Sequence, residues 1–101
     1  MAKNKLIWAQ SAKIKLFEIL DYYKNRNCSV AYSKKLFKKI SKSTSLLLKY
    51  PDTGIKTDLE NVRALLVDNY IIFYEKATSE ILILSIWDTR QNPAKLSMKQ
   101  K

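Results

Sequence analysis

Residues Val62 to Glu75 read VRALLVDNYIIFYE, and this stretch decides the fold of the chain. β-Branched and aromatic side chains, which are typical of strands, fill both halves, and Asp68-Asn69 between them is a typical turn pair. The pattern predicts an antiparallel hairpin with strands over Asn61 to Val67 and Tyr70 to Glu75. A third strand, Ile81 to Trp87, follows a second short turn, so a three-stranded meander is predicted.

The first half of the chain has the spacing of helices. After a short predicted strand over Lys5 to Gln10, Ser11 offers an N-cap hydroxyl, and a helix is expected from Ala12 to Arg26. Ser29 can cap a second helix that runs to about Lys49. Each helix is expected to bury one side, made of Leu16, Phe17, Ile19, Leu20 and Tyr23 in the first and of Ser33, Leu36, Phe37, Ile40, Thr44 and Leu47 in the second.

A loop joins this helical hairpin to the meander. Tyr50-Pro51 ends the second helix because a residue before proline is pushed out of the α region. The stretch 52–60, which holds the only glycine of the sequence, is predicted to be a loop. The resulting order is β-α-α-β-β-β, an α+β domain with a helical hairpin packed on a small, mainly antiparallel sheet. We expect residues 1–101 to form a single domain, with 98–101 as a frayed tail.

Bulk composition predicts a soluble protein with one small core. The hydrophobic share is 47%, and no apolar run approaches the roughly 20 residues that span a bilayer, so no membrane partner is expected. No secretory signal is recognised near the N-terminus, and the lone Cys28 cannot form an intrachain disulfide. These features favour a cytoplasmic location.

The formal net charge is +10, and the whole excess lies in the first half of the chain. Residues 1–50 carry twelve basic and two acidic residues, whereas residues 51–101 carry seven of each. On the second predicted helix, lysines gather opposite the apolar side, at Lys35, Lys38, Lys39, Lys42 and Lys49. Such a ridge is either a solvated face or a surface that attracts acidic proteins and nucleic acids. Reading of a DNA duplex through its bases is not expected, because arginines are nearly absent.

Several kinds of chemistry lack the residues that they need. The chain has no histidine, one cysteine and one glycine. It therefore lacks the usual general base near neutral pH, the ligands of a zinc site and a glycine-rich phosphate loop. We expect no metal, no cofactor and no small-molecule substrate.

The last predicted strand ends in IWDTRQNP, Ile86 to Pro93. In a structural interpretation Trp87 packs against the hairpin, Asp88 pairs with Arg90, and the final Asn-Pro makes a turn. In a functional interpretation Arg90 and Gln91 form a polar patch at the mouth of the sheet. The two interpretations can hold together, with the tryptophan and the acid as scaffold and the arginine as a contact.

The order of elements, together with VRALLVDNYIIFYE and ILILSIWDTRQNPAKL, resembles the RelE/ParE toxins of type II toxin–antitoxin (plasmid stabilisation) systems over Lys5 to Leu96. The resemblance implies a small basic toxin that inhibits bacterial growth and is neutralised by a cognate acidic antitoxin. It implies one of two targets, since RelE-like toxins cleave mRNA on the ribosome and ParE-like toxins poison DNA gyrase. A nontoxic basic binding domain with the same fold is a further alternative.

The basic residues that the resemblance implies for a RelE-like nuclease are mostly absent. The arginine expected directly after Tyr70, at the start of the strand Tyr70 to Glu75, is replaced by Ile71, and the expected lysine pair on the preceding strand falls on Val62 and Ala64. Arg90 alone matches the pattern, and no tyrosine or histidine follows it. We therefore favour the ParE-like alternative, which needs a recognition surface and no catalytic set.

Three groups of candidate residues follow. An endoribonuclease would have to use Arg90, Arg63 and Lys56, helped by Tyr70 or Tyr74. A target-binding surface would use Arg90, Gln91, Asn92 and Trp87. An acidic antitoxin would bind the apolar and cationic surface of hairpin and sheet, including Lys35, Lys38, Lys39, Lys42, Phe73 and Leu84.

Overall fold

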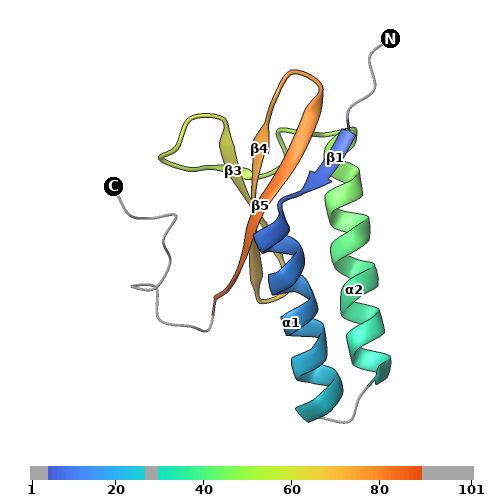
Figure 1. The fold of residues 1–101 in the computed structure, drawn as a ribbon. Helices are drawn as coiled ribbons and strands as arrows, with labels where there is room; N and C mark the ends of the chain where they lie inside the picture. The colour runs from blue at the N-terminus through green and yellow to red at the C-terminus, as the bar shows by residue number, and fades with distance from the viewer. Residues whose placement is uncertain (1–4, 27–29, 90–101) are drawn as a thin grey trace.

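The computed structural model describes residues 5–26 and 30–89. In chain order its elements are β1 (Lys5–Trp8), α1 (Gln10–Arg26), α2 (Val30–Ser45), a 3₁₀ turn η1 (Leu46–Leu48), β2 (Ile55–Lys56), β3 (Val62–Val67), β4 (Tyr70–Lys76) and β5 (Glu80–Asp88). Within the described ranges the strands form one sheet of order β1-β5-β4-β3-β2. β1 is parallel to β5, and the other neighbours are antiparallel. The α+β class and the meander are confirmed (Figure 1).

The helices α1 and α2 run antiparallel and lie on one face of the sheet, which we call the inner face (Figure 1). Strand side chains alternate between faces, and those on the inner face meet the apolar sides of both helices in the main core. Ile72 and Ile83 from the sheet and Ile40 from α2 are fully buried there. This core fixes the hairpin against the sheet.

The opposite, outer face of the sheet carries a smaller apolar cluster. Val62 and Phe73 are 7% and 6% exposed, and the partly buried side chains packed against them are Ala64, Ile71, Leu84 and Trp87. The strand register puts Ala64 opposite Phe73 and Ile71 opposite Trp87, so these side chains share one face. Neither α1 nor α2 lies on this face (Figure 1).

Both predicted turns form, and β5 contains a bulge. Asp68 has a φ of 54°, in the left-handed region that aspartate and asparagine tolerate better than most residues. Opposite Phe73 and Tyr74 the pairing passes from Ser85 to Ile83, so Leu84 is an extra residue in β5. Because of it, Ile83 and Ile86 both reach the main core.

One strand was missed, and several predicted boundaries are wrong, including the end of the first strand, which is Trp8 and not Gln10. The stretch 52–60 is predicted to be a loop, yet Ile55–Lys56 forms β2, which is too short to show an alternating pattern. α1 begins at Gln10, so Ser11 lies in its first turn and is not the N-cap. α2 ends at Ser45 and the chain tightens into η1, whereas the helix is predicted to continue to about Lys49.

The prediction that Phe17 and Phe37 lie on the buried sides of their helices is also wrong. They are 57% and 43% exposed. The remaining members of both predicted sides are buried or partly buried. Within the described ranges, no helix has both the length and the apolar character to cross a membrane.

Candidate functional site

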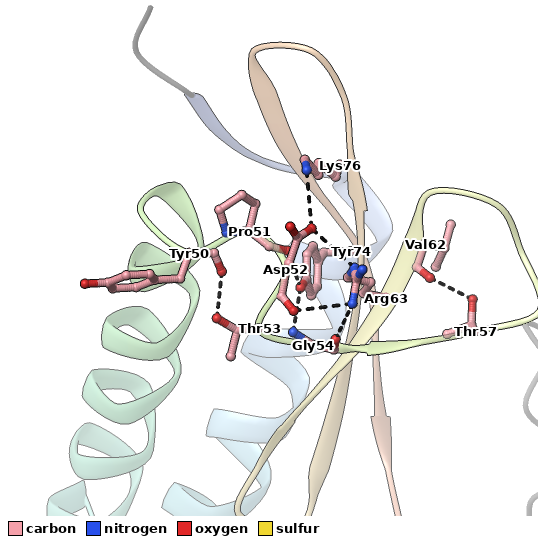
Figure 2. A network of polar contacts seen from close by, with 10 residues as sticks. All are labelled: Tyr50, Pro51, Asp52, Thr53, Gly54, Thr57, Val62, Arg63, Tyr74 and Lys76. Atoms are coloured by element: carbon pink, nitrogen blue, oxygen red, sulfur yellow. Dashed lines mark hydrogen bonds and ion pairs between the residues drawn. The ribbon is translucent and has the colours of Figure 1, made fainter.

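One end of the sheet carries a network of polar contacts around Arg63 (Figure 2). Its guanidinium donates to the carbonyl oxygens of Gly54 (2.7 Å) and Asp52 (3.3 Å), and its Nε lies 3.6 Å from the Asp52 carboxylate. Lys76 Nζ reaches the same carboxylate at 3.3 Å. Arg63, a catalytic candidate from the sequence, thus holds the 51–54 loop against the sheet.

Tyr74 completes this network from the inner face. Its hydroxyl donates to the Pro51 carbonyl (2.7 Å) and accepts from the Gly54 N–H (2.9 Å). Burial raises the pKa of the Tyr74 phenol above its ordinary value, although the Gly54 N–H and the Arg63 charge act to lower it. A phenol that stays protonated and bonded on both sides is poorly suited to act as a general base near neutral pH.

The other tyrosine candidate is also internal. Tyr70 is 2% exposed, and its hydroxyl donates to that of Tyr23 at 3.1 Å in the main core. Neither tyrosine therefore faces a surface where a macromolecular substrate could meet it.

Lys56 lies on the exposed β2 and lines a cleft of about 450 Å³ with Arg63 and Lys76. The same cleft is lined by the carboxylates of Asp52, Asp58 and Glu60. These acids offset the cations, so the cleft does not offer the concentrated positive charge that a transferring phosphate needs.

The three positions at which the resemblance expects nuclease cations come together in the structure. Val62, Ala64 and Ile71 all lie in the outer-face cluster, beside Phe73 and Trp87. The cations are therefore replaced by a contiguous apolar surface. The sequence alone could not show this apolar surface, because the strand register is needed to place the three residues side by side.

The predicted antitoxin contacts on the sheet differ in accessibility. Leu84 and Trp87 are partly exposed, and so is neighbouring Ile71. Phe73 is only 6% exposed, so it packs against these side chains and offers little accessible area to a partner.

A second apolar surface lies on the helical hairpin. The exposed rings of Phe17 on α1 and Phe37 on α2 line a groove of about 460 Å³ together with Leu20, and Lys34 and Lys38 also line it. Sequence reasoning missed this groove because it placed both rings in the core. Their position at the margin of each apolar side, about 100° from Leu16 and Leu36 on a helical wheel, is the signal that could have found it.

The four predicted lysines of α2, Lys35, Lys38, Lys39 and Lys42, are all exposed. Lys39 forms an ion pair with Asp68 in the β3–β4 turn (3.0 Å). Within the described ranges no ion pair joins Lys35, Lys38 or Lys42 to an acidic group. Trp87 is placed at the end of β5, whereas Arg90, Gln91 and Asn92 lie outside the described residues.

The whole arrangement has a solved counterpart. A chain of the "Chromosomal ParDE TA system from P. aeruginosa" matches this fold with a TM-score of 0.73 and 21% sequence identity, covering 85% of this chain and 96% of that chain. At this identity the likeness defines the class of fold, a helical hairpin on a small mixed sheet. A search of the curated proteins finds no match.

The sequence itself identifies the family. The family model described as the ParE toxin of the type II toxin–antitoxin system parDE matches residues 6–93, which is most of the chain. This protein belongs to the ParE toxin family. The predicted resemblance to RelE/ParE toxins is confirmed on its ParE side.

Proposed function

We propose that this ParE-family toxin arrests bacterial growth by binding DNA gyrase, without cleaving RNA, and that a cognate acidic antitoxin neutralises it. The observation that carries the proposal is the apolar outer face of the sheet, where Val62, Ala64 and Ile71 occupy the places of nuclease cations. Attack of a ribose hydroxyl on a phosphate needs an acid or base and several cations around one phosphate. The described part of the sheet offers no such set.

The polar residues that remain on the sheet support the same conclusion. Arg63 is occupied with the Gly54 and Asp52 carbonyls, and Tyr74 with Pro51 and Gly54. Recruiting either group for catalysis would release the 51–54 loop. A binding function requires no such rearrangement.

We assign target binding to the end of β5 and the residues that follow it, with Trp87, Arg90, Gln91 and Asn92 as contacts. Trp87 is partly exposed on the outer face at this end of the strand. Arginine supplies five donors in a fixed fork, which suits a carboxylate or phosphate of a large partner.

We assign antitoxin binding to the groove of the hairpin, the lysines of α2 and the exposed part of the outer face around Leu84. The groove is apolar between Phe17 and Phe37 and is bordered by Lys34 and Lys38. This combination fits an amphipathic segment with apolar anchors and acidic flanks.

Inducible expression in bacteria tests the toxin function. Expression alone should arrest growth, DNA supercoiling should fall before translation does, and co-expression of the antitoxin should restore growth. Arg90→Ala should weaken the arrest while leaving the fold intact, and Lys95→Ala is the control with the same loss of charge. Specific mRNA cleavage on ribosomes by the wild type, lost in Arg90→Ala, would make the protein an interferase and overturn the proposal. Normal growth at confirmed soluble expression would favour a nontoxic binder.

Antitoxin binding is tested at the groove. Phe37→Ala should weaken antitoxin affinity by roughly 10- to 100-fold, because exposed aromatic anchors carry much of the energy of such interfaces. Val30→Ala is the control, since Val30 is exposed on α2 but does not line the groove. Equal effects of the two changes in a calorimetric titration would place the antitoxin elsewhere.

A further inference from the structure

One face of α2 consists of lysines and small residues. Lys35, Lys38 and Lys42 follow each other at the spacing of a single helical face, and all three are exposed. The other residues at this spacing are Ala31 and Ser45, also exposed. We call Lys35, Lys38 and Lys42 the lysine stripe. It has no apolar residue within it, although Lys38 also borders the groove on the neighbouring side of the helix.

The sequence around the stripe offers its positive charge no acidic neighbour. Residues 22–51 contain eight lysines and arginines and no acidic residue. Lys34–Lys38, Lys35–Lys39 and Lys38–Lys42 are like-charge pairs four residues apart, an arrangement that destabilises a helix. The Lys39–Asp68 ion pair involves a lysine beside the stripe and none of its three members. These like-charge pairs destabilise the helix, and no described contact of the stripe offsets that cost. We infer that a partner supplies the compensating negative charge.

The composition of the stripe indicates which partner. Protein interfaces are built around apolar and aromatic anchors and are depleted in lysine. Contacts to the phosphates of a nucleic acid need cations alone and carry no sequence information. The 16 residues of α2 span about 24 Å. A DNA duplex presents a phosphate charge about every 1.7 Å along its axis, so it can contact the whole length of the helix.

We propose that the lysine stripe binds the phosphate backbone of double-stranded DNA, independently of sequence. This goes beyond the proposed function, since it does not depend on which enzyme the toxin inhibits. Lys38 also lines the groove assigned to the antitoxin. The proposed function also assigns Lys35 and Lys42 to the antitoxin, so an antitoxin bound there would compete with DNA for the whole lysine stripe.

The test measures binding of the full-length toxin to a labelled short duplex of mixed sequence by fluorescence anisotropy. Affinity should fall steeply between about 50 and 200 mM salt. The variant Lys35→Gln/Lys38→Gln/Lys42→Gln should bind roughly 100-fold more weakly at about 0.1 M salt, with a salt slope less steep by nearly 3, because each phosphate contact contributes about 0.9. The matched control, Lys5→Gln/Lys13→Gln/Lys24→Gln, removes the same charge from exposed sites on β1 and α1 and should lose far less.

Two results would overturn the proposal. Equal losses of DNA affinity in the two triple variants, both shown to be folded by circular dichroism, would mean that the affinity depends only on the net charge of the protein. Displacement of the duplex by polyglutamate as readily as by unlabelled duplex, at equal charge concentration, would make the stripe a surface for an acidic protein. Retention of supercoiling inhibition in the stripe variant would leave the proposed target intact, so the two proposals can fail separately.

Discussion

The sheet and the helical hairpin differ in what their polar side chains contact. At the end of the sheet, Arg63 and Tyr74 are bonded to the backbone of the 51–54 loop, and Lys76 pairs with Asp52. On α2, by contrast, Lys35, Lys38 and Lys42 project to solvent without an ion pair to any described residue. The difference teaches that these polar groups of the sheet serve stability, whereas the lysine stripe of the hairpin is available to partners. Substitutions on the two regions should therefore have separable effects.

The largest effect is expected on stability, from replacing an isoleucine by alanine once in each region. Ile83→Ala in the sheet should lower the free energy of unfolding by about 2–5 kcal/mol, because it leaves a cavity in the core. Ile14→Ala on α1 should change it by only about 0.5 kcal/mol or less. Ile83 is 0% exposed and Ile14 50%. Urea unfolding checks both, and similar losses would refute the separation.

Gly54→Ala should have the next largest effect. An added Cβ would lie 2.7 Å from Tyr74 Oη, which is closer than real Cβ contacts come, and 3.0 Å from the Ala64 carbonyl oxygen, which is tighter than most of them. We expect a loss of about 1–3 kcal/mol, since the ring and the strand are both fixed by packing. Thermal unfolding measures the loss, and Thr53→Ala serves as the neighbouring control. An unchanged melting temperature would mean that the loop is not held as described.

Tyr74→Phe should destabilise by about 1–2 kcal/mol, because the Gly54 N–H and the Pro51 carbonyl lose their partner. The variant should also change the dependence on pH. Burial raises the pKa of Tyr74 in the folded protein, so the folded state keeps this proton longer than the unfolded state. The contribution is complete below the ordinary tyrosine pKa of 10.0 and is lost as the pH rises toward the folded value. The stability difference between wild type and variant should therefore shrink in alkali, and a constant difference would contradict it.

The smallest effect concerns the contact between the two regions. Asp68→Asn keeps a residue that tolerates the positive φ of the turn but removes the Lys39–Asp68 ion pair. Both side chains are substantially exposed, so about 0.2–1 kcal/mol is expected, and less in high salt. A salt-independent loss would indicate that the turn, not the ion pair, is affected.

The sheet was predictable from sequence to the extent that its strands are long and apolar. VRALLVDNYIIFYE predicts β3, its turn and β4 almost to the residue, because β-branched side chains and the Asp-Asn pair agree. The bulge at Leu84 was not predictable, since either side of it is a run of similar apolar residues. β2 was missed because a strand of two residues is too short to show an alternating pattern of apolar and polar side chains.

The candidate surfaces were less predictable than the fold. Helical spacing located the lysines of α2, because charged residues opposite an apolar side face solvent. The groove at Phe17 and Phe37 was missed, since periodicity cannot tell a ring at the margin of the core from one within it. The contacts of Arg63 could not be predicted, because its acceptors, the Gly54 and Asp52 carbonyls, are backbone groups that no side-chain pattern reveals.

The place of β1 in the sheet has a consequence for the order of synthesis. β1 is made first, yet its register runs only along β5, from Lys5 opposite Glu80 to Trp8 opposite Ile83. At roughly 5–20 residues per second, several seconds of translation separate the two strands. During that interval the nascent chain contains the residues of the helical hairpin but lacks the strand with which β1 pairs. Any product released before Glu80 therefore lacks the closing strand, so premature termination yields a fragment that cannot complete the toxin fold.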